Sequence, residues 1–363
     1  MVKNMKKFKV CVYAISKNEE KFVDRWVKSM KEADEIYVLD TGSTDNTVEK
    51  LINHGVKVSE DKIIPWRFDI ARNRSLNMVP LDCDLCVCTD LDEVFEPGWR
   101  DKLEENYQKG ARVNYTYNWH INESGNPDVT FLLNKIHPRL GYVWTHPVHE
   151  VLTPLNKENN INIESIILNH YPDTNKSRGS YLELLELSVK EDPLDDRNMH
   201  YLGREYMYYK KWEECINTLK KHLELKSATW NLERAASMRY IARSYFNLQN
   251  IKESEFWYKK AIEEASNIRE GYVELAMLYN YTGNYLESIY YLIKALSIKS
   301  KELVYINEIF CWDCTIDDLL SINYYNLELY ELALYHIDKA LEYNKENERL
   351  QNNKKLIEIK IKF

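Results

Sequence analysis

Short apolar runs alternate with amphipathic stretches over residues 8–170. The continuous apolar run at 8–15 predicts a strand that is buried on both faces. Apolar residues then recur every three or four positions over 19–31, which indicates an amphipathic helix. The same alternation continues to residue 90. It predicts strands at 35–40, 56–60 and 84–90 and helices at 48–53 and 68–79.

Strands that alternate with helices favour a mostly parallel sheet with helices on both of its faces. Three further apolar stretches predict strands at 112–119, 129–136 and 161–168. The fold class expected for this part of the chain is therefore α/β. In such a sheet the loops that follow parallel strands gather at one edge, where ligands bind.

A different pattern begins near residue 176 and is helical almost throughout. A small residue followed by tyrosine three positions later recurs four times, at Gly203, Ala242, Ala276 and Ser321. The interval from Ala242 to Ala276 is 34 residues, which is the tetratricopeptide period, whereas the intervals on either side are 39 and 45 residues. Small residues let paired helices approach closely, and one repeat cannot bury its face alone. We therefore predict that the four repeats stack into a short solenoid.

Composition narrows the classes of function. The 363 residues suggest two domains, which we place at 1–175 and 176–363. A net charge of −8 argues against a general surface for nucleic acid or anionic membrane. No apolar run is long enough to span a bilayer or to serve as a signal peptide. Seven cysteines, an odd number, indicate reduced thiols in a cytoplasmic protein.

The strongest chemical signal is the pair Asp90 and Asp92 at the end of the strand predicted at 84–90. Carboxylates two residues apart on an extended chain lie on the same face of the strand. They repel one another unless a cation neutralises them, and Mg²⁺ or Mn²⁺ prefers oxygen ligands and can carry a diphosphate. The alternative is a solvated acidic turn after a strand.

Two other predicted strands end in polar residues. Asp40 ends the second strand, and the polar loop at 16–20 follows the first. Both should lie at the same sheet edge as Asp90, so three strands would bring polar loops together. Asp40 has the alternative role of capping the helix that follows, although polar residues of the next turn could do this instead.

These segments together resemble the family 2 glycosyltransferases of the GT-A fold. The motifs are SKNEE at 16–20, LDTGSTDNT at 39–47, ARN at 71–73 and TDLDE at 89–93. The resemblance implies a nucleotide-sugar donor, usually a sugar of uridine diphosphate (UDP), and a divalent metal. Two positions depart from the family's pattern. Lys17 replaces a frequent aromatic residue, and Thr41 replaces a frequent second aspartate, which leaves only Asp40 for the uracil.

The resemblance also implies roles for single residues. The residues expected to hold the donor are Ser16, Asn18, Asp40, Arg72 and Asp90. Of these, Asp40 should bond the base, Arg72 should lie near the nucleotide, and Asp90 should contact ribose or metal. Asp92 should bind the metal, Mn²⁺ or Mg²⁺. His149 could be a third metal ligand, because a neutral imidazole suits Mn²⁺.

Family 2 enzymes invert, and inverting transfer in one step needs a base that deprotonates the acceptor. The candidate carboxylates are Glu150, Asp128 and Glu93. Glu93 should point away from its neighbour Asp92, and Asp128 lies in a polar loop. Glu150 is favoured because it closes the segment 138–150, which is similar to a subgroup of these transferases with C-terminal tetratricopeptide repeats. Sublancin-type peptide S-glycosyltransferases resemble this layout, as do some bacterial transferases that act on cell-surface glycans.

The predicted function is an inverting, metal-dependent transfer of a hexose or N-acetylhexosamine from a UDP-sugar. The predicted acceptor is a Ser, Thr or Cys side chain of a peptide or protein, which the repeats would bind along their length. The alternatives are an enzyme of cell-surface glycan synthesis, a nucleotidyltransferase and a non-catalytic scaffold. A nucleotidyltransferase usually has a glycine-rich first loop, which SKNEE lacks. The repeats could instead form a homodimer interface.

Overall fold

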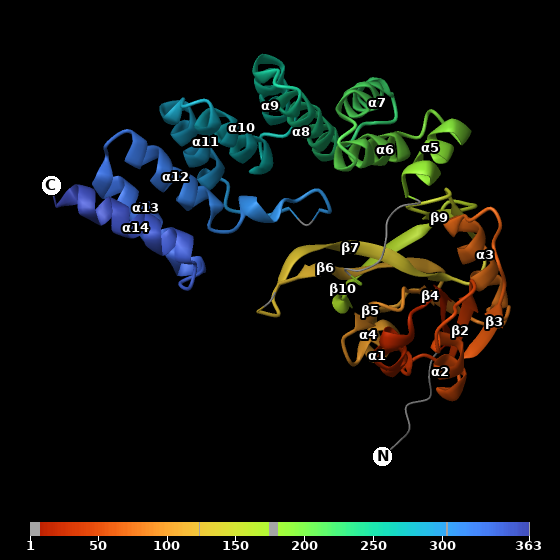
Figure 1. The fold of residues 1–363 in the computed structure, drawn as a ribbon. Coiled ribbons are helices and arrows are strands. Elements are labelled where there is room, and N and C mark those ends of the chain that lie inside the picture. The colour runs from red at the N-terminus through yellow and green to blue at the C-terminus, as the bar shows by residue number, and fades with distance from the viewer. Residues whose placement is uncertain (1–7, 123, 174–180, 303, 363) are drawn as a thin grey trace. The chain divides into compact units, whose positions relative to one another are not determined.

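The structure, a computed structural model, describes residues 8–122, 124–173, 181–302 and 304–362 (Figure 1). It divides into two compact units. The first comprises residues 1–188 with 303–305, and the second comprises 189–302 with 306–363. The boundary predicted at residue 175 falls in 174–180, outside the described residues.

The first unit is built on an eight-stranded sheet with the order β3-β2-β1-β4-β7-β6-β10-β5. Its strands are β1 (Val10–Ser16), β2 (Glu35–Asp40), β3 (Lys57–Glu60), β4 (Leu85–Cys88), β5 (Glu93–Phe95), β6 (Ala111–Ile121), β7 (Pro127–Pro138) and β10 (Asn159–His170). A separate two-stranded sheet pairs β8 (Tyr142–Thr145) with β9 (Val151–Pro154). The short strands β5, β8 and β9 were not predicted, since none carries a long apolar run.

Strand direction determines which residues share an edge of the large sheet. Strands β1 to β4 are mutually parallel. Strand β7 runs antiparallel to both β4 and β6, and β6 is parallel to β10. Strands β6 and β10 therefore run in the same direction as β4. The carboxyl ends of β1, β2, β4, β6 and β10 consequently lie at one edge, although their residues are far apart in sequence.

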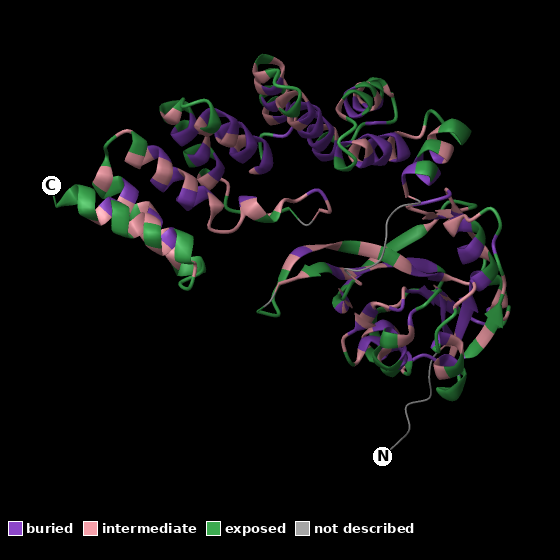
Figure 2. Cartoon of the chain, viewed as in Figure 1, coloured by how far each residue is buried: buried purple, intermediate pink, exposed green. Residues whose placement is uncertain are grey.

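Helices cover both faces of this sheet, as the alternation predicted. The helices of the first unit are α1 (Glu20–Met30), α2 (Thr47–Asn53), α3 (Phe68–Met78) and α4 (Trp99–Asn106). Val10 and Val12 of β1 pack in one core cluster with α1, α2 and α4. Cys11 and Tyr13 point to the other face, where they pack with Leu76 of α3. Figure 2 shows the buried residues along these strands. The predicted α/β class with a mostly parallel sheet is confirmed.

The second unit consists of helices that pack as consecutive pairs (Figure 1). They follow α5 (Tyr181–Glu191), which spans the boundary between the units. The pairs are α6 (Asp196–Tyr208) with α7 (Trp212–Glu224), α8 (Asn231–Asn247) with α9 (Ile251–Glu264), α10 (Glu270–Tyr281) with α11 (Tyr285–Ser297), and α12 (Thr315–Asn326) with α13 (Tyr330–Tyr343). A last helix, α14 (Glu348–Ile361), packs on α13. The prediction of four tetratricopeptide-type helical repeats is confirmed.

The small residue of each predicted repeat lies where two helices approach closely. A Cβ atom built on Gly203 of α6 would stand 2.3 Å from Cδ2 of Leu219 on α7, closer than any two such atoms can approach. Ala242 and Ala276, at the equivalent positions of the next two pairs, are fully buried. The repeat spacing in the sequence therefore reflects the sites where a larger side chain would separate the helices.

The longest repeat interval contains an insertion between α11 and α12 that includes a short 3₁₀ helix, η1 (Ile309–Cys311). Its Glu308 contacts Arg243 and Arg239 of α8, which also bind the buried Glu274 of α10. Glu308 thus joins the insertion to a charge network whose centre, Arg239 and Glu274, is buried. Within the part of the chain that the structure describes, no helix has both the length and the apolar character needed to cross a membrane.

Candidate functional site

Asp40 organises the loop that follows β2. Its side chain is fully buried, and its two carboxylate oxygens accept four hydrogen bonds. The donors are the hydroxyl of Ser16 (2.8 Å), the backbone N–H of Gly42 (2.9 Å), and both the backbone N–H (2.7 Å) and the hydroxyl of Ser43. Gly42 has φ +109°, a conformation that favours glycine. The carboxylate predicted to bond a nucleotide base therefore holds the loop around it.

Asn18 joins the loop after β1 to the loop after β2. Its backbone has a positive φ of 55°, which asparagine tolerates better than most residues. Its N–H donates to the hydroxyl of Ser43 (2.8 Å), and its Oδ1 accepts from the N–H of Thr44 (2.7 Å). Lys17 beside it is exposed. Ser16, Asn18 and Asp40, which were predicted to share one site, thus belong to one hydrogen-bonded pair of loops.

Arg72 of α3 connects two of the predicted acidic residues. Its Nε donates to Oε1 of Glu150 at 3.0 Å, and its Nη2 bonds Oδ1 of Asp90. Only 2% of the residue is exposed. Its Nη1 is buried and has no hydrogen-bond partner among the described residues. A buried guanidinium nitrogen without a partner is costly, and an acceptor such as a phosphate oxygen that reached this atom would remove that cost.

Positive charges hold Asp90 in its ionised form. Lys135 of β7 places its Nζ 3.9 Å from Oδ2 of Asp90, and Arg72 bonds the other oxygen. Burial alone would raise the pKa of Asp90, but Arg72 and Lys135 lower it below its usual range. The carboxylate is therefore available as a ligand or hydrogen-bond acceptor and not as a general base near neutral pH.

Asp92 and Glu93 face different surroundings. Asp92 lies with Oδ2 3.6 Å from Nε2 of His170, and its side chain is partly exposed. Glu93 is buried, and it accepts from the backbone N–H of Asp90 (2.9 Å) and the hydroxyl of Tyr117 (2.8 Å). Burial raises the pKa of Glu93. Glu93 therefore holds the turn at residues 90–93, here called the acidic turn, in place from the interior. The side chain of Asp92 remains partly exposed and can reach a ligand.

His170 and Trp119 complete this edge and were not predicted as site residues. His170 ends β10, and Trp119 lies near the end of β6. The two rings stack with centroids 4.6 Å apart and planes at 23°. Nδ1 of His170 lies 3.0 Å from the carbonyl oxygen of Trp119. The direction of β6 and β10 relative to β4, which the sequence did not reveal, is what brings these residues to Asp92.

A buried hydrogen-bond chain positions the segment that carries Glu150. The indole N–H of Trp144 donates to the hydroxyl of Tyr13 (2.9 Å), which lies 2.8 Å from Nε2 of His137. Nδ1 of His137 lies 2.7 Å from the carbonyl oxygen of Pro138, and burial lowers the pKa of His137 to about 3. The imidazole is therefore neutral, donating from Nδ1 and accepting at Nε2. Asn73 binds both the N–H and the carbonyl of Trp144 (2.9 and 2.8 Å), which links this segment to α3.

The predicted metal ligands contact different neighbours. Asp90 faces Arg72, Asp92 faces His170, and His149 makes an edge contact with the ring of Tyr181 at 5.7 Å. Both aspartates have partly exposed side chains, and carboxylate oxygens are the ligands that Mg²⁺ and Mn²⁺ prefer, so the chemistry of this pair suits such an ion.

Among the described residues, one group of three metal-binding side chains converges, and it lies in the second unit. It contains His200, His222 and Glu233, whose ligand atoms lie within 4.8 Å of one another. The hydroxyl of Ser237 lies 2.7 Å from Nδ1 of His200 and 3.0 Å from Nδ1 of His222. One hydroxyl can donate to one ring and accept from the other, so this group is a buried hydrogen-bonded cluster of the helical core.

Asp128, the alternative base, belongs to the far part of the β6–β7 hairpin. Its oxygens contact Asn122 (3.0 Å) and His120 (3.2 Å). It stands seven positions before Lys135 on β7, on the order of 20 Å along an extended strand. Glu150 instead shares Arg72 with Asp90.

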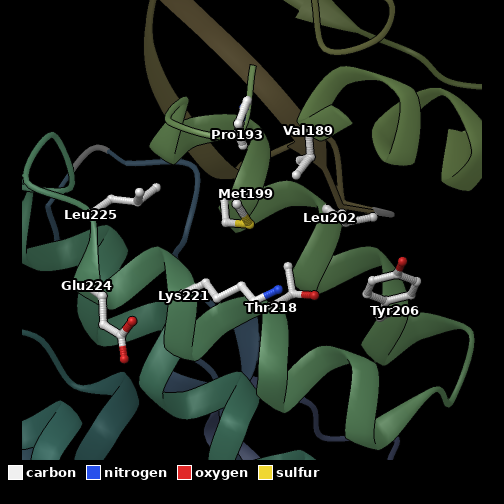
Figure 3. A pocket seen from close by; sticks show the side chains of 9 residues that line it. All are labelled: Val189, Pro193, Met199, Leu202, Tyr206, Thr218, Lys221, Glu224 and Leu225. Carbon is white, nitrogen blue, oxygen red and sulfur yellow. The ribbon is translucent and has the colours of Figure 1, made fainter. Parts of the chain in front are cut away.

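The second unit contains a pocket of about 570 Å³ (Figure 3). It is lined by Val189, Pro193, Met199, Leu202, Tyr206, Thr218, Lys221, Glu224 and Leu225. Most of these residues come from α6 and α7, and they are largely apolar. Of the lining residues, two are charged, Lys221 and Glu224. The pocket therefore differs from the sheet edge of the first unit, where several charged side chains meet.

One comparison with known proteins gives a match within the first unit. Residues 11–162 match the family model described as glycosyl transferase family 2. No curated protein matches the chain.

Similar solved structures include three proteins. One is MamA (18% identity, 46% of this chain and 83% of that chain, TM-score 0.37). Another is a thermophilic TPR protein of Thermus thermophilus (16% identity, 50% and 90%, TM-score 0.37). The third is YrrB, described as a TPR protein with an unusual peptide-binding site (16% identity, 49% and 83%, TM-score 0.37).

Proposed function

We propose, from the match of residues 11–162 to the glycosyl transferase family 2 model, that the protein transfers a hexose or N-acetylhexosamine from a UDP-sugar to a peptide or protein. The observation that carries the proposal is Arg72, buried between Asp90 and Glu150 with Nη1 left for a further acceptor. A diphosphate supplies such an acceptor, and Lys135 adds a second positive charge beside Asp90.

The nucleoside would lie against the loops that follow β1 and β2. In this proposal Asp40 acts mainly by ordering these loops, because its carboxylate already accepts four hydrogen bonds. Ser16 supports Asp40, and Asn18 fixes the neighbouring turn. The exposed Asn18 is the member of this set that could also reach the ligand directly.

A divalent cation, Mn²⁺ or Mg²⁺, would be held by Asp92 with Asp90. When bound, it would neutralise negative charge that develops on the departing diphosphate. His149 remains the proposed third ligand. Arg72 and Lys135 of this chain would bind the same diphosphate from the side of Asp90 and orient it before transfer.

Glu150 is the proposed base. The acceptor oxygen or sulfur would bond the anomeric carbon of the sugar as the bond to UDP breaks on the opposite face, which inverts the configuration. The proton of the acceptor would pass to Glu150, and UDP would leave with the bonding electrons. Arg72 holds one oxygen of Glu150, so the carboxylate has a fixed orientation at the site.

The helical repeats are the proposed dock for the acceptor. Stacked helical repeats present an extended surface that suits a peptide better than a small sugar. We therefore propose a Ser, Thr or Cys side chain of a peptide or protein as the acceptor, and a cytoplasmic location. Transfer to a cell-surface glycan is the alternative acceptor class, and homodimer formation is the alternative use of the repeats.

The decisive experiment measures UDP release by the purified full-length chain. UDP-glucose, UDP-galactose and their N-acetylhexosamine analogues would each be supplied with Mn²⁺, with and without excess EDTA. Metal-dependent release from at least one donor supports the proposal. A chain that neither binds nor cleaves any of these donors would refute it and would favour a scaffold or a nucleotidyltransferase.

The acceptor class needs a separate assay. The full-length chain, its active donor and Mn²⁺ would be incubated with peptides that contain Ser, Thr or Cys and, in parallel, with oligosaccharides. A mass increase of one sugar on a peptide supports the proposed acceptor. Transfer to oligosaccharides alone would move the assignment to glycan synthesis.

A further inference from the structure

Trp119 presents an aromatic surface beside the acidic turn. The residue is 50% exposed, although it lies near the end of a central strand, β6. One face of the indole is covered by the imidazole of His170, with centroids 4.6 Å apart. Half of Trp119 stays exposed beside this contact. An exposed indole in a sheet loses the stabilisation that burial would give it, which points to a ligand.

The orientation of this indole is fixed. Nδ1 of His170 contacts the carbonyl oxygen of Trp119 itself (3.0 Å), and Nε2 faces Oδ2 of Asp92 (3.6 Å). The ring of Tyr117 lies 6.2 Å from the indole, and its hydroxyl is bound to the buried Glu93. Trp119 is thus linked to Asp92 through His170. Its other ring neighbour, Tyr117, is bound to Glu93 of the same turn.

The order of the strands indicates which part of a donor would reach Trp119. Along the sheet edge, the loops of β2 and β1 come first, the acidic turn after β4 comes next, and the ends of β6 and β10 lie beyond it. A nucleoside at the first position and a diphosphate at the second leave the sugar at the third. Trp119 and His170 occupy this third position.

We propose that Trp119 is a stacking platform for the pyranose ring of the donor sugar. The electron-rich face of an indole attracts the C–H groups that line one face of a hexopyranose. His170 is the positioning residue, since it holds the indole next to Asp92. This inference rests on the proposed function and adds to it the residue that recognises the sugar.

The test compares a donor with its nucleotide alone. The variants are Trp119→Ala and Trp119→Phe, and the control is Trp230→Ala, since Trp230 lies in the second unit and is 39% exposed. Calorimetry would give the Kd of each protein for UDP and for the active UDP-sugar in Mn²⁺. Trp119→Ala should weaken binding of the UDP-sugar roughly three- to tenfold and leave UDP binding unchanged. Trp119→Phe should retain part of the difference, and the control should show none.

Equal affinities of the wild type and Trp119→Ala for the UDP-sugar would overturn the platform and leave the proposed function standing. An equal loss for UDP and the UDP-sugar would also overturn it, because the indole would then contact the nucleotide or support the fold. A wild-type chain that binds UDP-sugars not at all would refute the proposed function and the platform together.

Discussion

Nε of Arg72 lies 3.0 Å from Oε1 of Glu150, so the middle of α3 is tied to a residue 78 positions later in the chain. The same guanidinium bonds Asp90 through Nη2. One buried cation thus organises two carboxylates that follow different strands. This arrangement makes Arg72 the residue whose replacement should reveal most about the site.

Arg72→Lys should weaken UDP binding about 10- to 100-fold, the equivalent of about 1–3 kcal/mol. Lysine keeps the charge, but its three donors lie on a single nitrogen and cannot reproduce the planar fork that joins Asp90 to Glu150 and leaves Nη1 for a phosphate. The measurement is calorimetry with UDP. The control is Arg74→Gln, because Arg74 lies two residues away on α3 and forms an exposed ion pair with Asp61. Unchanged affinity in Arg72→Lys would remove Arg72 from the donor site.

Asp92→Asn should reduce donor cleavage in Mn²⁺ by about 100-fold or more while the melting temperature changes little. The substitution preserves the shape of a partly exposed side chain and removes the charge that would hold the cation. UDP release would be followed at several Mn²⁺ concentrations. Asp101→Asn on the exposed surface of α4 serves as the control. Full activity of the wild type in excess EDTA would contradict the metal requirement.

Asp40→Asn should destabilise the protein by about 1–3 kcal/mol as well as weaken UDP binding. The new amide group would face donors where the carboxylate now accepts four hydrogen bonds, so both loops should lose their order. Denaturant unfolding and calorimetry would be measured on the same variant, with Asp61→Asn, at a partly exposed position, as control. Weaker binding with unchanged stability would show instead that Asp40 contacts the base directly, as the sequence alone suggested.

The sequence predicted the elements that have strong periodicity or long apolar runs. The strand predicted at 35–40 agrees with β2, and the helix predicted at 68–79 agrees with α3 to within one residue. Strand β5 has three residues, too few for a pattern. The positions of Asp40, Asp90 and Asp92 at strand ends could be predicted because each follows an apolar run. Their loops meet because the strands are parallel.

The remaining site residues could not be found in this way, because strand order and direction are tertiary properties. Lys135 reaches Asp90 only because β7 pairs antiparallel with β4. Trp119 and His170 meet Asp92 only because β6 and β10 run parallel to β4. The local sequence around Trp119 reads as an ordinary strand. A prediction of sheet order would have been needed to place these residues at the edge.

Gly203→Ala should destabilise the second unit by about 1–3 kcal/mol, although alanine favours helices more than glycine. The new methyl group would collide with Leu219, which lies 2.3 Å from the position of the Cβ atom. Denaturant unfolding followed by circular dichroism would measure the loss. Gly271→Ala is the matched control, since its Cβ would meet Ile262 at 3.0 Å. In a Leu219→Ala background the cost of Gly203→Ala should shrink, and an unchanged cost would exclude the steric explanation.

Glu274 should make the stability of the second unit depend on pH. Burial by itself would raise the pKa of Glu274, but Arg243 and Arg239 lower it to about 2. The folded pKa thus lies below the ordinary value of 4.5. The stabilisation from this ion pair is therefore fully present above pH 4.5 and is lost as the pH falls from there toward 2.

Glu274→Gln should accordingly cost about 3–5 kcal/mol at neutral pH, because it removes the buried carboxylate that the buried Arg239 and the partly exposed Arg243 share. Melting temperatures of the wild type and the variant would be compared from pH 7 down to pH 3. The gap between them should be widest at neutral pH and narrow below pH 4.5, since the wild type loses the charge that the variant already lacks. Glu287→Gln, an exposed position on α11, should show no gap at any pH. A gap for Glu274→Gln that stays constant down to pH 3 would mean that the network stabilises the helices through packing and not through charge.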